Sequence, residues 1–243
     1  GAAPMMRIAV AGFATAAVVE CFIQLDAPDR SGQKSSSPVD DMREAARFLT
    51  RERPHIFRLL LICGALNFLV TGYAEVGFPY MVRTLLGFDA GAYGVAYALV
   101  GVSGLVGALA GGMVASRLSM RRFPLTILAF ALTILPQALA MMLPVAATVR
   151  LAALTAGTCG TMVSICISNL ISVPAIQMSC PEGLTGKVMS LALSCSLCAQ
   201  PLGQITYGLA YGALPAGVVL FATFALALLC AVPVARVADR FEA

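Results

Sequence analysis

Long runs of apolar residues divide the sequence, and each is about the length needed to cross a lipid bilayer. A membrane-spanning helix needs roughly 20 consecutive, mostly apolar residues. Seven such runs cover residues 5–25, 56–80, 92–115, 123–143, 148–173, 188–211 and 215–235. The first run differs from the others because it also contains Arg7, Glu20 and Gln24. We therefore predict an all-α, polytopic membrane protein with about seven transmembrane helices.

The composition and the pattern of polarity exclude two other fold classes, a soluble globule and a membrane β-barrel. Hydrophobic residues make up 59% of the chain and charged residues 12%, whereas a soluble domain is about half apolar and about a quarter charged. The polar surface is therefore too small to cover a soluble globule. A membrane β-barrel would instead show segments of about ten residues with alternating polarity, and no such alternation is present.

The basic residues predict the orientation, because Lys and Arg near the ends of spans are retained on the cytoplasmic side. If residues 26–55 are cytoplasmic, that side holds 13 basic residues and the outer side holds three, Arg7, Arg83 and Arg150. We expect a multi-pass protein of the cell membrane with its N-terminus outside and its C-terminus in the cytoplasm. The formal charge of +4 is then a topology signal, and we expect no nucleic-acid partner.

The spacing of the runs predicts three parts: a transmembrane helix over residues 1–25, a cytoplasmic linker over 26–55 and a six-helix body over 56–243. Within the linker, Met42, Ala45, Ala46 and Leu49 recur at helical spacing among charged residues. This favours an amphipathic helix on the cytoplasmic surface, with a solvated connector as the alternative. One helix, a long loop and six helices also suggest a partial chain, whose N-terminal half is the expected partner beside the bilayer.

Metal and enzyme chemistry find little support in the residues present. Seven of the eight cysteines lie inside apolar runs, where they behave as small apolar residues, and His55 is the only histidine. Zinc sites need clustered Cys and His ligands, so we expect no metal and no other cofactor. No HExxH motif, paired intramembrane aspartates or Ser/His arrangement is present, and we expect no enzyme activity.

Two stretches resemble known motifs of one transporter family. Gly112, Arg117, Arg121 and Arg122 match the cytoplasmic signature of the major facilitator superfamily, while Ser116 and Ser119 replace its acidic residue and a glycine. These departures are common in the second half of such transporters. The resemblance implies an alternating-access transporter of twelve helices, of which this chain would supply helices six to twelve.

The second stretch resembles the drug-efflux branch that includes macrolide and enterobactin exporters. Its pattern begins with Val173-Pro174, continues from Cys180-Pro181-Glu182 through Gly186-Lys187-Val188 to Ser190, and ends with Gln200-Pro201-Leu202-Gly203. The segment from Phe48 to Arg51 also resembles the central loop of that branch. The two motifs together mark seven residues for a cytoplasmic gate: Gly112, Arg117, Arg121, Arg122, Glu182, Gly186 and Lys187.

Polar residues at helical spacing identify the candidate transport pathway. Asn67, Thr71 and Glu75 are four residues apart and share one helical face. Glu75 is the only carboxylate well inside the last six runs. It either binds a proton or a cationic substrate in a cavity, or reaches water at the outer interface.

The sixth run carries a similar row. Gln200, Gln204, Tyr207 and Tyr211 fall on one face, where they either line a substrate path or join helices by hydrogen bonds. Gly107 and Gly111 form a seam of small residues that favours close packing of two helices. The same seam is the alternative candidate for a surface on which two halves rock.

These features together predict a membrane transporter that exports amphipathic small molecules by proton-coupled alternating access. The alternative from another class is a seven-helix receptor or signalling protein. A retinal-linked pump is excluded, because the only lysines, Lys34 and Lys187, lie outside the body of any apolar run.

Overall fold

The computed structural model describes residues 2–22, 38–114, 118–181 and 183–238. They belong to two compact units, Gly1–Ser37 and Pro38–Ala243. The first unit contains α1 (Ala2–Cys21), a helix of 20 residues. Its apolar stretch Val10–Cys21 is shorter than the roughly 20 residues of a full span. A spanning role for residues 5–25 therefore stays a prediction.

The second unit contains six helices long and apolar enough to cross a membrane, which confirms the all-α, polytopic fold. Its elements follow in the order α2 (Pro38–Arg47), η1 (Phe48–Glu52), α3 (Pro54–Thr71), η2 (Gly72–Gly77), η3 (Tyr80–Leu85), α4 (Ala90–Met113), η5 (Met120–Arg122), α5 (Phe123–Met142), α6 (Ala147–Met178), α7 (Thr185–Ala213) and α8 (Ala216–Ala238). η2 and η3 are π-helical turns that extend the span of α3 to Leu85, five residues beyond the predicted end.

Local signals explain where these helices begin and turn. Pro54 starts α3, where its missing N–H is harmless. The Asp89 carboxylate accepts a hydrogen bond from the Ala92 N–H at 2.8 Å and caps α4. Gly87 and Gly183 have φ angles of 69° and 89°, a region that favours glycine, and they form the turns before α4 and α7.

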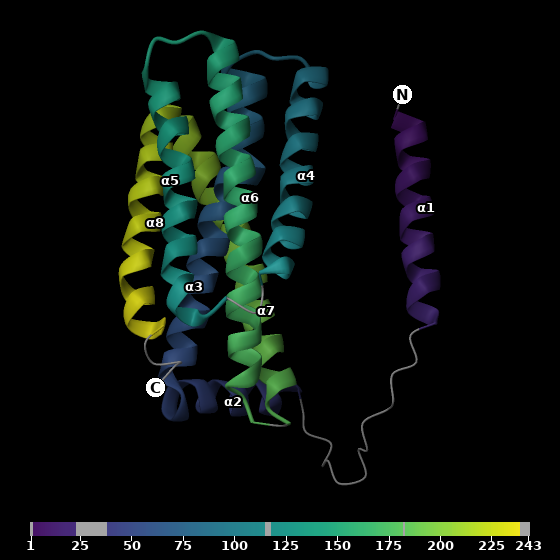
Figure 1. Ribbon diagram of the computed structural model, residues 1–243, viewed down its shortest axis with the longest axis vertical. Coiled ribbons are helices and arrows are strands. Elements are labelled where there is room, and N and C mark those ends of the chain that lie inside the picture. The colour runs from purple at the N-terminus through teal and green to yellow at the C-terminus, as the bar shows by residue number, and fades with distance from the viewer. Residues whose placement is uncertain (1, 23–37, 115–117, 182, 239–243) are drawn as a thin grey trace. The chain divides into compact units, whose positions relative to one another are not determined.

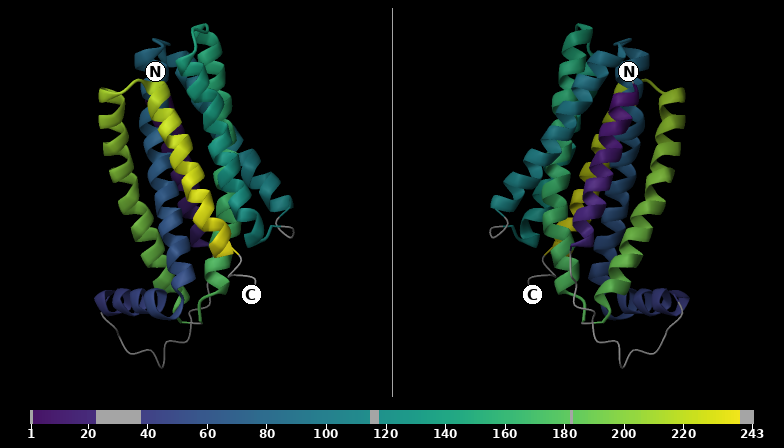
Figure 2. Two further views of the ribbon diagram at one scale, coloured as in Figure 1. Left: turned by 90° about the vertical axis from the view of Figure 1, so that its left-hand side faces the viewer. Right: turned by 90° about the vertical axis from the view of Figure 1, so that its right-hand side faces the viewer.

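The six long helices pack as an up-and-down bundle (Figure 1). α5 packs against α6 and α8, α6 against α4, and α3 against α7 and α8. α7 and α4 therefore lie at opposite edges of the arrangement, and the short helix α2 lies across one end of the bundle (Figure 2). The face between these two edges carries the candidate site.

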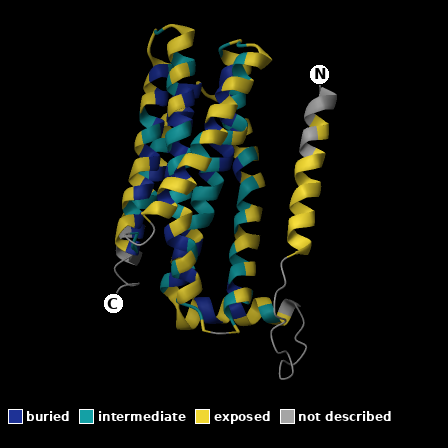
Figure 3. Ribbon diagram, turned by 45° about the vertical axis from the view of Figure 1, so that its right-hand side comes forward, coloured by how far each residue is buried: buried dark blue, intermediate teal, exposed yellow. Residues whose placement is uncertain are grey.

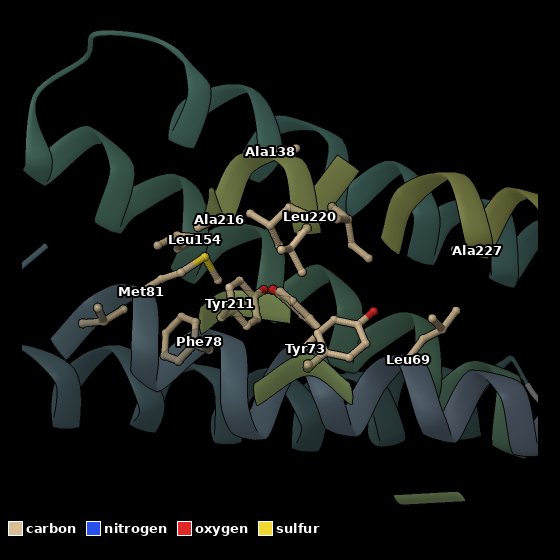
Figure 4. Close-up of a cluster of buried hydrophobic side chains, with 14 of the residues drawn as sticks. Leu69, Tyr73, Phe78, Met81, Ala138, Leu154, Tyr211, Ala216, Leu220 and Ala227 are labelled. Carbon is tan, nitrogen blue, oxygen red and sulfur yellow. The ribbon is translucent and has the colours of Figure 1, made fainter. Parts of the chain in front are cut away.

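Two apolar clusters hold the bundle together. One joins η2 and η3 with α5, α6, α7 and α8, and includes Tyr73, Phe78, Tyr211 and Leu220 (Figure 4). The other joins α2 and η1 to the ends of α3, α5, α6, α7 and α8 and includes Leu49, at the opposite end of α3. The amphipathic segment is thus packed on the six-helix body and belongs to the same unit.

The buried face of this segment differs from the predicted one. Ala45 and Leu49 are buried as expected, together with Phe48, whereas Met42 is 51% exposed and Ala46 is also exposed. After α2 the chain continues in the π-helical turn η1, in which the Arg53 N–H donates to the carbonyl oxygen of Phe48. This five-residue turn changes the angular position of the residues that follow the α-helix.

The outward surface of the bundle is strongly apolar. Figure 3 shows exposed residues along its outer faces, and those of α4 include Val95, Leu99, Leu105 and Leu109. A soluble monomer rarely exposes contiguous apolar patches of this kind, but a bilayer solvates them. The surface therefore agrees with a membrane location.

Candidate functional site

A cavity of about 250 Å³ lies between η2 and the helices α3, α4, α6 and α7. Four of the predicted pathway residues line it: Asn67, Thr71, Glu75 and Gln200. The remaining lining residues are Val70, Ala74, Tyr97, Val100, Thr158, Met162 and Ile165. The cavity thus brings together the predicted polar face of α3 and η2 and the predicted Gln200 of α7.

A smaller cavity of about 60 Å³ adjoins it and shares Asn67, Val70 and Ile165. Ser168, Asn169 and Ser172 of α6 add polar groups to its wall, and the Ser168 hydroxyl donates to Thr126 Oγ1 at 2.7 Å. Polar side chains therefore continue along α6 toward the end of the bundle that carries α2.

Glu75 and Gln204 are joined directly, although 129 residues separate them in sequence. The Gln204 Nε2 donates to Glu75 Oε2 at 2.6 Å, and the Glu75 side chain remains exposed. A charge-assisted hydrogen bond of this kind is stronger than one between neutral groups. The contact places a carboxylate, its amide partner and the cavity in one site.

Asn67 and Thr71 are held by their own helix. The Asn67 Nδ2 donates to the Cys63 carbonyl oxygen at 3.0 Å, and the Thr71 hydroxyl donates to the Asn67 carbonyl oxygen. Such bonds to the preceding turn are common for polar side chains in helices. They fix both groups at the cavity wall.

Gly203 explains how α7 comes close enough for Gln204 to reach Glu75. A Cβ atom at Gly203 would lie 2.3 Å from the carbonyl oxygen of Phe68, so only glycine permits this approach of the two backbones. The sequence identified Gly203 as part of a family motif, and the structure supplies the physical reason.

Tyr207 lies in a different place from its predicted neighbours on α7. Its side chain is 4% exposed, and its hydroxyl forms a hydrogen bond of 2.7 Å with the Thr223 hydroxyl of α8. It lies in the apolar core and outside the set of residues that lines the cavity. The bond joins α7 to α8, as the alternative interpretation expects, and a part for Tyr207 in the transport pathway stays a prediction. Its ring packs against Gly72, on the side of η2 that faces the core.

A buried polar cluster behind the cavity was not predicted. The Tyr73 hydroxyl donates to Gln137 Oε1 at 2.6 Å and also forms a hydrogen bond with the Thr158 hydroxyl. Gln137, in turn, donates from Nε2 to the Thr133 carbonyl oxygen at 2.9 Å. The signal in the sequence was Gln137 itself, a polar residue in the middle of an apolar run.

The glycine seam is confirmed as a close helix contact. A Cβ atom at Gly107 would lie 2.9 Å from Val163 Cα, and one at Gly111 would lie 2.5 Å from Leu170 Cδ1. Both glycines of α4 therefore face α6. Gly101 and Gly104 have open space beside them.

The motif residues of the predicted cytoplasmic gate are distributed over several elements. The Lys187 ammonium at the start of α7 pairs with Asp41 at 2.8 Å and with Glu44 at 2.6 Å, both on α2. Arg121 and Arg122 are exposed on η5, Gly112 is exposed near the end of α4, and Gly186 is exposed in the first turn of α7. Arg117 and Glu182 lie outside the described residues.

A metal site is not evident in the part of the chain that the structure describes, since no three His, Cys, Asp or Glu side chains cluster there. The cavity offers instead one carboxylate, amide and hydroxyl groups, and an apolar wall. Such a set offers a carboxylate that can take up a proton, and groups that can hold a small molecule by hydrogen bonds and apolar contacts.

Comparison with known proteins agrees with this architecture. The family model of the Major Facilitator Superfamily matches residues 3–204. No curated protein and no solved structure matches the chain. The match covers most of the six-helix body that carries the cavity, and members of this family are transporters. The chain belongs to the Major Facilitator Superfamily and is a membrane transporter.

Proposed function

We propose that this transporter exports amphipathic small molecules in exchange for protons. The observation that supports the proposal is the hydrogen bond between Glu75 and Gln204 at the edge of the cavity. An ionisable residue inside a membrane span is costly and usually serves transport. Proton binding to Glu75 removes its charge and weakens its bond to the Gln204 amide, so a proton and a cationic ligand compete for the same carboxylate.

The lining of the cavity supports an amphipathic substrate. Val100, Met162 and Ile165 provide apolar contacts, while Asn67 and Gln200 provide amide groups. Ligand pockets combine such an apolar wall with a few polar groups that fix orientation. An apolar body with one basic nitrogen fits this pattern, because the nitrogen pairs with Glu75.

We further propose that a second set of helices, the N-terminal half expected from the family resemblance, completes the cavity. The volume of about 250 Å³ lies below the ~300–1,000 Å³ of typical ligand pockets. Glu75 is exposed on this face, where a second half would enclose it. Alternating access then consists of rocking of the two halves around this site. The receptor alternative gains no support from the family match.

The proposal is tested with Glu75→Gln in membrane vesicles that carry a pH gradient, with ethidium as the transported probe. We expect pH-driven efflux to be lost, because glutamine cannot take up and release the proton that drives export. Ethidium binding without a gradient should be retained in part, since the apolar and amide groups of the cavity wall are unchanged.

Glu52→Gln is the matched control, because Glu52 is an exposed carboxylate on η1, away from the cavity. It should transport like the wild type. Equal efflux by the wild type and Glu75→Gln would remove Glu75 from the mechanism and leave the interfacial alternative.

A further inference from the structure

The segment that carries Glu75 is one π-helical turn, and it fits its neighbours closely. The Phe78 N–H donates to the Tyr73 carbonyl oxygen, five residues earlier. In a continuous α-helix, residues four apart share a face. In η2, Gly72 and Gly77 are five residues apart, and both face α7. Cβ atoms there would lie 2.2 Å from the Tyr207 ring and 2.5 Å from the Tyr211 hydroxyl. The extra residue of the π-helical turn therefore places the two glycines, five residues apart, opposite two tyrosines of α7 that are four residues apart.

The side chain of Tyr73 fixes this turn from the other side. Tyr73 and Gln137 are fully buried and Thr158 is 1% exposed, so the hydrogen bonds of the Tyr73 hydroxyl to α5 and α6 are shielded from water. Gly157 leaves the space for this arrangement, because a Cβ atom there would lie 2.2 Å from Gln137 Nε2. Figure 4 shows Tyr73 within the buried cluster, beside Leu69 and Tyr211.

We propose that Tyr73 is a positioning residue, which holds the π-helical turn so that the Glu75 carboxylate meets Gln204. The role of Glu75 in transport rests on the function proposed above, but the positioning of Glu75 by Tyr73 does not. π-helical turns occur often at functional sites, and here the turn has a defined anchor. Thr158 also lines the cavity, so the anchor of the turn lies directly beside the cavity.

The test measures the geometry of the site directly. In full-length chains with all eight native cysteines replaced, Glu75→Cys and Gln204→Cys are introduced as a pair, and the rate of cross-linking by a short bifunctional thiosulfonate is measured in vesicles. Adding Tyr73→Phe removes only the hydroxyl. We expect the cross-linking rate to fall, because losing one buried hydrogen bond lowers the equilibrium constant of the held turn about fivefold.

Two controls separate positioning from general loosening. Tyr207→Phe removes a buried hydroxyl of the same kind, bonded to Thr223 of α8, and should leave the rate unchanged. A second cysteine pair at Thr126 and Ser168, whose hydroxyls are 2.7 Å apart, should cross-link equally with and without Tyr73→Phe. Thr158→Val, which removes the partner hydroxyl and keeps the shape, should reproduce the effect of Tyr73→Phe.

An unchanged Glu75–Gln204 cross-linking rate in both Tyr73→Phe and Thr158→Val would overturn the proposal, and so would an equal fall at the Thr126–Ser168 pair. These outcomes are independent of the transport assay. If Glu75→Gln leaves efflux unchanged while cross-linking still depends on Tyr73, the proposed function fails and the positioning role stands.

Discussion

Replacing Gly203 by alanine should push α7 away from α3 and break the Glu75–Gln204 contact. The added Cβ atom would lie 2.3 Å from the Phe68 carbonyl oxygen and 3.2 Å from Phe68 Cα. Carbon–oxygen contacts are normally about 3.3 Å or longer, so the two helices must separate locally by about 1 Å. No side-chain rotation relieves this overlap, because both atoms belong to backbones or are fixed to them.

The expected cost follows from these distances. Overpacking of a close contact costs about 1–3 kcal/mol. A separation of 1 Å also lengthens the 2.6 Å bond between Gln204 and Glu75 to roughly 3.6 Å, beyond hydrogen-bonding distance. Loss of such a bond in a membrane protein costs about 0.6 kcal/mol on average. Together these costs should make Gly203→Ala about 2–4 kcal/mol less stable than a glycine-to-alanine change on the same helix that meets no overlap.

Gly208→Ala is the matched control, because Gly208 lies on the same helix and has open space beside its Cα. Both substitutions gain the same helix propensity, about 1 kcal/mol, so the difference between them isolates the packing cost. Unfolding by sodium dodecyl sulfate, followed by circular dichroism, gives the two stabilities. Equal stabilities would refute the close approach of α3 and α7 at Gly203, and so would unchanged cross-linking at the Glu75–Gln204 pair.

Three further predictions concern the surfaces of the bundle. Lys187→Gln removes both ion pairs to α2 and should speed trypsin cleavage at Arg43 and Arg47. High salt should speed the same cleavage in the wild type. Unchanged cleavage rates in both cases would contradict the pairing. Burial raises the pKa of the Cys180 thiol. A chain with this single cysteine should therefore react with N-ethylmaleimide only at higher pH than a chain whose single cysteine replaces the exposed Glu52. Identical pH profiles of the two reactions would be evidence against that burial. Single cysteines at residues 36 and 90 should be labelled by an impermeant thiol reagent from opposite sides of the membrane, and labelling from one side would reject the predicted orientation.

The sequence by itself determined the six spans, because a bilayer demands runs of apolar residues and each helix satisfies its own backbone hydrogen bonds. α5 begins at Phe123 as predicted and ends one residue early, at Met142. Helical periodicity also placed Asn67, Thr71 and Glu75 on one face, and the structure finds all three at one cavity. These features depend on spacing along a single helix, which the sequence records directly.

Only the tertiary structure decided which faces meet. Periodicity grouped Tyr207 with Gln200 and Gln204, but the packing of α7 against η2 and α8 turns Tyr207 into the core. The π-helical turn at Gly72–Gly77 was also not readable, because the hydrogen-bond partners of Tyr73 on α5 and α6 are distant in sequence. The Glu75–Gln204 bond likewise requires α3 and α7 to approach at Gly203, and that distance is set by the packing of whole helices.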